Sequence, residues 1–136
     1  MTPVFVDTFF FLALLNKDDR SHPEAVHWAD RVGGRLVTTS WVLVETANAL
    51  SSPARRARFG LLMDFVRSQE GIRVVDAAQP LFEEGTELYL SRDDKAWSLT
   101  DCISFVVMRR EGLQDALTAD HHFDQAGFHT LMGNKA

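Results

Sequence analysis

The chain has a single cysteine among its 136 residues, so it cannot form an internal disulfide bond. It also lacks a long apolar run, since the only stretch that suggests targeting, residues 3–15, contains Asp7, has no basic segment before it and is too short to span a bilayer. The formal net charge of −5 argues against a protein that coats nucleic acid through a basic surface. We therefore expect a cytoplasmic protein that does not enter the membrane.

Length and composition are those of one soluble globular domain. Hydrophobic residues make up 46% of the chain and charged residues 24%, which is ordinary for a folded domain and far from a disordered one. We find no internal repeat or linker, and we interpret residues 1–136 as a single domain. Cys102 is followed by Ile103, Phe105 and Val106, a context that predicts a small buried side chain rather than a catalytic thiol.

Short apolar segments alternate with helical patterns along the chain. Strands are predicted at 4–6, 36–39, 72–75, 115–119 and 129–132, and helices at 9–15, 22–32, 41–50, 52–70, 78–90, 99–112 and 122–126. Three helix starts carry serine as the predicted N-cap, namely Ser21, Ser40 and Ser98. This alternation predicts an α/β fold in which a central parallel sheet is flanked by helices on both faces, an α/β/α sandwich.

Four acidic residues, Asp7, Glu45, Asp101 and Asp120, lie far apart in sequence but beside predicted strand ends or on predicted helices. Asp7 and Asp120 each follow a strand, and ligands of parallel sheets bind beyond the carboxyl ends of strands. Glu45 and Asp101 lie on helices that can frame the same cleft. No lysine or arginine stands directly beside any of the four, so we expect an external cation to neutralise them.

A purely structural role has to be weighed for each of the four acids. Asp120 can cap the short helix that follows it, and Asp101 can favour its helix by lying in the first turn. Asp7 interrupts an apolar run, and Glu45 shares its helix with Trp41, Val42 and Leu43, so a solvated face explains neither of these two acids well.

A cluster of four carboxylates predicts a divalent metal. Two carboxylates about 5 Å apart repel by roughly 3 kcal/mol at an effective dielectric constant of 20. Mg²⁺ or Mn²⁺ relieves this repulsion through hard oxygen ligands and leaves coordination positions for a phosphate. Such a centre suits phosphodiester hydrolysis. Asp124, four residues after Asp120, is a possible fifth ligand or a supporting acid.

The motifs around these acids resemble those of the PIN domain, and more narrowly those of VapC-type toxin ribonucleases. The motifs are Val6-Asp7-Thr8, Val44-Glu45, Ser98-Leu99-Thr100-Asp101-Cys102 and Leu117-Thr118-Ala119-Asp120 with the following Phe123. The resemblance implies a Mg²⁺- or Mn²⁺-dependent endoribonuclease that is often dimeric and is inhibited by a small antitoxin protein.

The same resemblance assigns roles by position. It implies a catalytic centre of Asp7, Glu45, Asp101 and Asp120, with the metal held by Asp7, Asp101 and Asp120. Thr8 and Ser98 match supporting polar positions, and Asp124 matches a variable acidic one.

Other side chains have weaker interpretations. Arg55, Arg56 and Arg58 either steer RNA phosphates or form a solvated helix face. His121 and His122 lie near the predicted cleft but are interpreted as solvated side chains, since an oxygen-rich site does not need them.

Three alternatives remain open from sequence. The first is a PIN-type RNA-processing nuclease without an antitoxin. The second is a phosphate-accepting receiver domain, although the first strand ends in a single acid and no lysine follows a late strand. The third is a non-catalytic interaction module.

Overall fold

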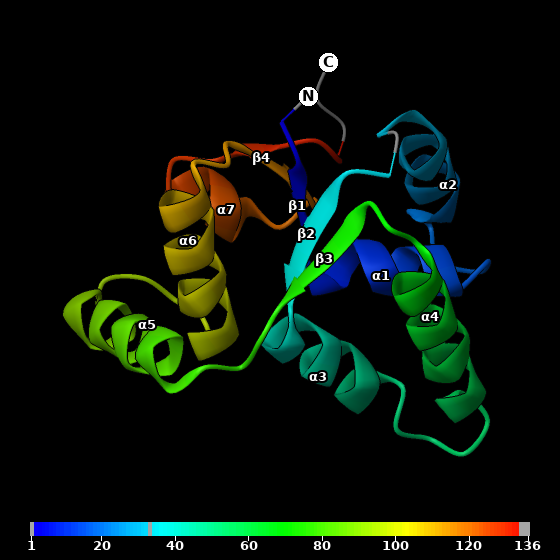
Figure 1. Ribbon diagram of the computed structural model, residues 1–136, viewed down its shortest axis with the longest axis horizontal. Helices are drawn as coiled ribbons and strands as arrows, with labels where there is room; N and C mark the ends of the chain where they lie inside the picture. Colours follow the sequence, from blue (N-terminus) through cyan, green and yellow to red (C-terminus); the bar gives the residue numbers. More distant parts are fainter. Residues whose placement is uncertain (1, 33, 134–136) are drawn as a thin grey trace.

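A five-stranded parallel sheet forms the centre of the fold (Figure 1). The computed structural model describes residues 2–32 and 34–133. The strands are β1 (Val4–Val6), β2 (Leu36–Thr39), β3 (Ile72–Val75), β4 (Asp115–Leu117) and β5 (His129–Thr130), in the order β3-β2-β1-β4-β5. Every neighbouring pair is parallel. The chain therefore extends the sheet from β1 toward β3 and then crosses back to β4.

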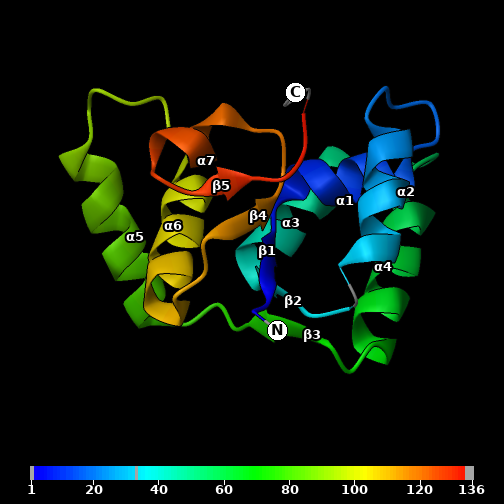
Figure 2. The same cartoon turned by 90° about the horizontal axis from the view of Figure 1, so that it is seen from above.

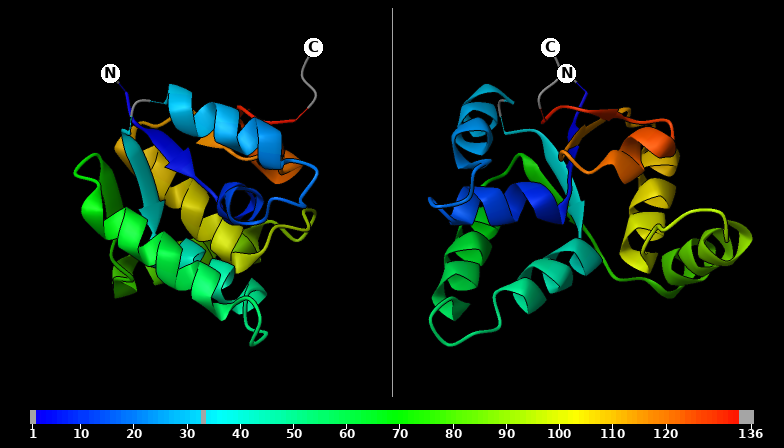
Figure 3. Two further views of the ribbon diagram at one scale, coloured as in Figure 1. Left: turned by 90° about the vertical axis from the view of Figure 1, so that its right-hand side faces the viewer. Right: turned by 180° about the vertical axis from the view of Figure 1, so that it is seen from behind.

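Seven helices connect these strands within the described part of the chain. They are α1 (Thr8–Leu15), α2 (His22–Arg31), α3 (Ser40–Ala49), α4 (Arg56–Ser68), α5 (Gln79–Ser91), α6 (Leu99–Glu111) and α7 (His121–Gln125). Parallel connections are right-handed, so reversing the direction in which strands are added moves the helices to the opposite face. Figures 2 and 3 show α1, α2 and α4 on one side of the sheet and α5, α6 and α7 on the other. The predicted α/β fold with a flanked parallel sheet is confirmed.

Two predicted helix starts differ from the structure. Helix α4 begins at Arg56 rather than near Ser52, because the Arg55 and Arg56 amides both donate to the Ser52 carbonyl in a preceding turn. Helix α3 is capped by Thr39, whose hydroxyl accepts a hydrogen bond from the Val42 amide, and Ser40 is its first residue. A β-branched threonine suits both the last strand position and the cap.

The predicted caps at Ser21 and Ser98 have different outcomes. Ser98 forms the full capping box of α6 with Asp101. Among the described residues, the Ser21 side chain makes no capping hydrogen bond, and the Glu24 carboxylate accepts from the Gly133 amide instead. Glu24 therefore ties the first turn of α2 to Gly133, and the Ser21 amide donates to Asp19 Oδ1 instead of taking part in a capping box.

The last two strands are shorter than predicted. Strand β4 ends at Leu117 because the Thr118 amide turns back to the Ala116 carbonyl at 3.1 Å. Strand β5 covers only His129–Thr130. The turn after Leu117 directs the chain toward Asp120 at the carboxyl edge of the sheet.

The apolar core covers both faces of the sheet, with Phe10 of α1 and Val66 of α4 on one side and Phe105 of α6 on the other. Phe105 on α6 packs edge-on against Trp97 and Phe123, with ring centroids 5.0 and 4.9 Å apart. Cys102 is fully buried, as predicted. No helix in residues 2–32 and 34–133 has the length and apolar character needed to cross a bilayer.

Close packing of α5 on α6 depends on Gly85. A Cβ at this position would lie 2.3 Å from Ile103 Cγ1 and 3.2 Å from Ile103 Cα, and Ile103 is buried. We expect Gly85→Ala to destabilise the protein by about 1–3 kcal/mol, measured by thermal unfolding. Gly60→Ala on α4 is the control, since no described atom lies within 4 Å of its Cβ, and it should stabilise by roughly 0.5–1 kcal/mol. Equal Tm changes for the two variants would contradict this packing.

Candidate metal centre

The acidic residues meet where the strand order changes direction. Asp7 directly follows β1 and precedes α1. Asp120 follows β4, which pairs with β1 on the side opposite to β2. Helices from the two faces diverge at such a point and leave a crevice at the carboxyl ends of the strands. Glu45 on α3 and Asp101 in the first turn of α6 approach the same crevice from flanking helices.

Asp7 is the most buried of the four acids. Its side chain is 4% exposed, and its Oδ2 atom accepts a hydrogen bond from Thr118 Oγ1 at 3.0 Å. Burial, followed by the charge of Asp101 and a smaller effect of Glu45, raises the pKa of Asp7 from 3.8 to about 7. A buried carboxylate with a strongly raised pKa and charged neighbours is typical of a functional site.

Asp101 is held at the start of α6. Its Oδ2 atom accepts from the Ser98 amide at 3.1 Å, while its own amide donates to Ser98 Oγ at 3.0 Å. Burial and the charge of Asp120 raise the pKa of Asp101, and a hydrogen bond from the Ser98 amide and contact with His122 oppose that rise. The capping role therefore fixes the carboxylate in place instead of removing it from the cluster.

Glu45 is positioned by Thr8. Thr8 Oγ1 donates to Glu45 Oε1 at 2.5 Å and lies 3.4 Å from the Val42 carbonyl oxygen. The Thr8 side chain is buried and Glu45 is half-buried. The first turn of α1 is thus linked to the middle of α3, and the supporting role of Thr8 in the site stays a prediction.

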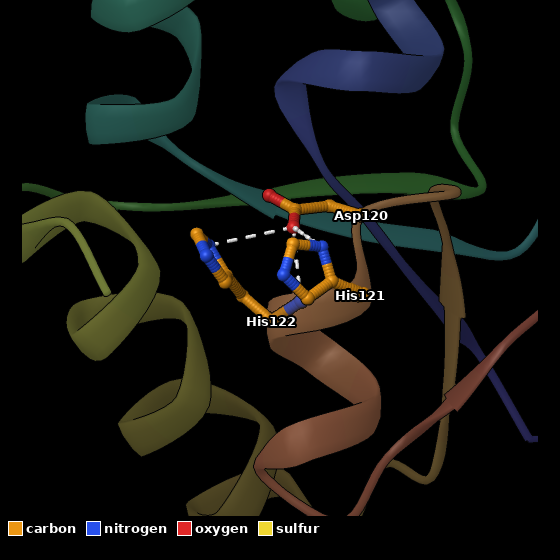
Figure 4. Close-up of side chains that lie close together, drawn as sticks. All are labelled: Asp120, His121 and His122. Carbon is orange, nitrogen blue, oxygen red and sulfur yellow. Dashed lines mark hydrogen bonds and ion pairs between the residues drawn. The ribbon is translucent and has the colours of Figure 1, made fainter. Parts of the chain in front are cut away.

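Asp120 lies beside two histidines at the start of α7 (Figure 4). Its Oδ1 atom accepts from the His122 amide at 2.9 Å, so it does cap this short helix. His122 Nδ1 lies 3.4 Å from Asp120 Oδ1 and 3.0 Å from Asp101 Oδ2. The structure thus places His122 between two acids, whereas the sequence interpretation treated it as a solvated side chain.

Thr118 connects two of the acids, a function that the sequence reasoning missed. Its hydroxyl donates to Asp7 Oδ2 and accepts a hydrogen bond from the Asp120 amide at 3.0 Å. The side chain is fully buried. The available signal was a hydroxyl residue two positions before an acid, a spacing at which threonine bonds to nearby backbone.

The electrostatic influences join all four acids into one cluster. Asp101 and Glu45 raise the pKa of Asp7, and Asp120 raises that of Asp101. An arrangement of hard carboxylate oxygens that resist joint ionisation matches the ligand preference of Mg²⁺ and Mn²⁺. The donor set therefore fits a divalent cation.

The remaining predicted side chains lie farther from this cluster. Asp124 Oδ1 accepts from Thr130 Oγ1 at 3.0 Å and so connects α7 to β5; a role in metal binding remains a prediction. Arg55 and Arg56 are exposed in the turn before α4 and at its start, and Arg58 is half-buried. Arg55 and Arg58 line a pocket of about 230 Å³ together with Leu12 and Ala49.

Comparison with known proteins agrees with this architecture. The model of the PIN domain matches residues 4–129. The chain is 33% identical over 126 residues to the 23S rRNA-specific endonuclease VapC20 of two Mycobacterium tuberculosis strains, which covers 92% of this chain and 95% of the relative. The crystal structure of M. tuberculosis VapC20, described as a sarcin–ricin loop cleaving toxin, matches with a TM-score of 0.83 and 30% identity over 92% of this chain and 95% of that one.

A more distant solved structure shares the fold. FitAcB from Neisseria gonorrhoeae matches with a TM-score of 0.69 and 14% identity over 95% of this chain and 96% of that one. The family model and the VapC20 match each cover nearly the whole chain, and the range matched by the family model, residues 4–129, includes all four acids. The chain belongs to the PIN-domain family.

Proposed function

We propose that this protein is a VapC-type toxin, a Mg²⁺- or Mn²⁺-dependent endoribonuclease that acts in the cytoplasm. The observation that carries the proposal is the electrostatic linkage of Asp7, Glu45, Asp101 and Asp120, since Asp101 and Glu45 raise the pKa of Asp7 and Asp120 raises that of Asp101. The similarity to an endonuclease over 92% of the chain supports it. The receiver-domain alternative has no comparable support.

We assign a role to each acid on the basis of its burial and its contacts. Asp7, Asp101 and Asp120 would hold the metal, which when bound supplies Lewis-acid stabilisation of the phosphate and lowers the pKa of a water molecule. Glu45 is half-buried and is oriented by Thr8. We assign Glu45 Oε2 to accepting a proton from the attacking water, because Oε1 already accepts a hydrogen bond from the Thr8 hydroxyl. Thr118 holds Asp7 in position.

Replacing Thr118 by valine tests this positioning role. Valine keeps the shape of the side chain but cannot donate to Asp7 or accept from the Asp120 amide. Groups that orient metal ligands typically affect metal affinity or activity by about 10–100-fold. We expect Thr118→Val to lower Mg²⁺ affinity in a calorimetric titration by that factor. Thr46→Val is the control, because Thr46 is also buried but its hydroxyl donates to the Val42 carbonyl within α3; equal losses in the two variants would contradict a specific role for Thr118.

The substrate that we propose is 23S ribosomal RNA. The support is the substrate named for the relative that is 33% identical to this chain and the sarcin–ricin loop named for the matching crystal structure. The test is to incubate the protein with three RNAs. These are a stem–loop of that rRNA segment, a scrambled stem–loop of equal length and total RNA. A single cut in the first substrate supports the proposal, and cleavage of the scrambled RNA at the same rate contradicts the proposed specificity.

Arg55, in the turn before α4, and Arg58, in the first turn of α4, are candidates for contacts with RNA phosphates. The pocket lined by Arg55 and Arg58 also includes Ala49, one turn after Glu45 on α3. We expect the Arg55→Glu, Arg58→Glu double variant to bind RNA more weakly and with a shallower salt dependence, by a slope of about one for each lost phosphate contact. Filter binding in Ca²⁺ at several salt concentrations measures both quantities. The Arg31→Glu, Arg67→Glu double variant is the control for net charge, because both residues are exposed and the change in charge is the same; equal weakening by this variant would contradict a specific contact.

An antitoxin and a second copy of the chain are the proposed protein partners. Large apolar side chains are exposed on α4 and α5, namely Leu61, Phe65, Phe82, Tyr89 and Leu90, and such surfaces commonly mark protein interfaces. Induced expression should arrest growth, and a small protein encoded beside the toxin should relieve the arrest. Growth without arrest, combined with metal-dependent cleavage in vitro, would favour an RNA-processing nuclease. Light scattering of the purified protein measures the oligomeric state.

A further inference from the structure

We propose that Asp120, His121 and His122, together with Asp101, form a second kind of metal site that binds a borderline transition-metal ion such as Zn²⁺. Figure 4 shows both imidazole rings beside the Asp120 carboxylate at the start of α7. One ligand atom from each of Asp120, His121 and His122 lies within 4.8 Å of the others. Nitrogen ligands distinguish this site from the all-carboxylate centre, with which it shares two acids.

The two distances from His122 to the acids are close to those in a tetrahedral site. Metal–ligand distances of about 2.0–2.1 Å place neighbouring ligand atoms of a tetrahedral Zn²⁺ site about 3.3 Å apart. His122 Nδ1 lies 3.0 Å from Asp101 Oδ2 and 3.4 Å from Asp120 Oδ1. His121 Nδ1 lies 3.8 Å from Asp120 Oδ1. The His121 side chain, which is exposed, has to rotate toward Asp101 and His122 to complete the set.

Three of the ligands are already held in place by the protein. The Ser98 amide donates to Asp101 Oδ2, and the His122 amide donates to Asp120 Oδ1. The His122 side chain is 20% exposed and that of Asp101 is 9% exposed, whereas that of His121 is 74% exposed. The fourth ligand thus stands at the solvent side, where an ion can enter. Little conformational freedom is lost when the three inner ligands bind.

Ligand chemistry separates the two ions. Mg²⁺ prefers oxygen ligands and octahedral geometry, while imidazole suits Zn²⁺ and similar ions. Because Asp101 and Asp120 belong to both ligand sets, a bound Zn²⁺ would compete with Mg²⁺. We therefore infer that Zn²⁺ inhibits the Mg²⁺-supported nuclease. This consequence rests on the proposed function, whereas the binding itself does not.

Binding is tested on untagged, intact protein with Co²⁺ and Zn²⁺. Tetrahedral Co²⁺ absorbs visible light much more strongly than octahedral Co²⁺, so the wild-type spectrum reports the geometry directly. Calorimetry should give one Zn²⁺ per chain in the presence of excess Mg²⁺. His121→Asn and His122→Asn should each weaken Zn²⁺ binding at least tenfold, since an amide can replace a hydrogen bond but is a poor ligand for Zn²⁺.

The control is His129→Asn. This histidine is also exposed and also contacts an acid, with His129 Nδ1 3.1 Å from Asp115 Oδ1, but Asp115 lies in β4, at the opposite end from the crevice. The variant should bind Zn²⁺ as the wild type does. An octahedral Co²⁺ spectrum, or unchanged Zn²⁺ affinity in both His121→Asn and His122→Asn, would overturn the proposed site.

Inhibition is measured as the ratio of cleavage with and without Zn²⁺ within each variant. We expect Zn²⁺ to suppress Mg²⁺-supported cleavage by the wild type at least tenfold more than by the double variant His121→Asn, His122→Asn. Equal suppression in both would overturn competition at these ligands. If no protein cleaves RNA with Mg²⁺ alone, the proposed nuclease function fails, and the Co²⁺ and Zn²⁺ measurements still decide the binding site.

Discussion

Replacing Asp7 by asparagine should lower the rate of RNA cleavage at least a hundredfold, and roughly a thousandfold if the variant no longer binds the metal ion. The same substitution should make the metal-free protein more stable at pH 8. Asp7 is buried beside Asp101 and near Glu45, and its pKa is raised to about 7. At pH 8 its ionised form therefore destabilises the fold. Asparagine has nearly the same size, carries no charge and can still accept the Thr118 hydrogen bond through its amide oxygen.

The opposite signs of the two effects make this prediction specific. Cleavage assays in Mg²⁺ measure the first effect, and urea unfolding in EDTA at pH 8 measures the second. Asp64→Asn on α4 is the control, because Asp64 is exposed and should change neither quantity. A variant of Asp7 that is both less stable and inactive would indicate ordinary structural damage, and one that cleaves like the wild type would show that Asp7 is not part of the centre.

The stability of the metal-free protein should fall as the pH rises from about 4 to 7. The Asp7 carboxyl titrates near 3.8 in the unfolded chain and near 7 in the folded one, so between these values the folded state binds more protons. Stability then decreases with rising pH and becomes level above the folded pKa. The difference for Asp7 is at most about 4 kcal/mol, and the raised pKa of Asp101 acts in the same direction.

Mg²⁺ should recover much of this loss at pH 8, because a ligand that binds only the folded state stabilises it in proportion to its occupancy. Urea unfolding at pH 5 and pH 8, in EDTA and in Mg²⁺, measures both effects. The Asp7→Asn variant should show a flatter pH profile in EDTA. Wild-type stability that rises from pH 5 to pH 8 in EDTA would contradict the buried, crowded carboxylate on which this account depends.

The sequence predicted the framework of the fold well because its signals are local. Apolar segments such as residues 4–6 and 36–39 are short, and helical patterns separate them, which is sufficient to indicate a parallel sheet. Strand-end positions then placed Asp7 and Asp120 at one edge. The fold class is confirmed by the structure. The charges of the four acids influence one another, and their role as the catalytic centre stays a prediction.

Contacts that depend on side-chain direction were not predictable in the same way. The two bonds of Thr118 require the turn after Leu117, and that turn shortened a predicted strand. His122 reaches Asp101 only because α7 lies beside α6, a proximity between residues far apart in sequence. Thr39 caps α3 in place of Ser40 because Thr39, the last residue of β2, keeps an extended backbone while its hydroxyl accepts from the Val42 amide, so Ser40 is already helical.

The most direct test of the central claim is a cleavage assay on the 23S rRNA stem–loop with antitoxin-free protein. The assay starts in EDTA, Mg²⁺ or Mn²⁺ is then added stepwise, and the Asp7→Asn variant is assayed in parallel. The account predicts no cut in EDTA, a discrete cut that appears with the metal, and no such cut by the variant at the same metal concentrations. Cleavage that persists in EDTA, or that the Asp7→Asn variant performs at the wild-type rate, would contradict an acidic metal centre built on Asp7.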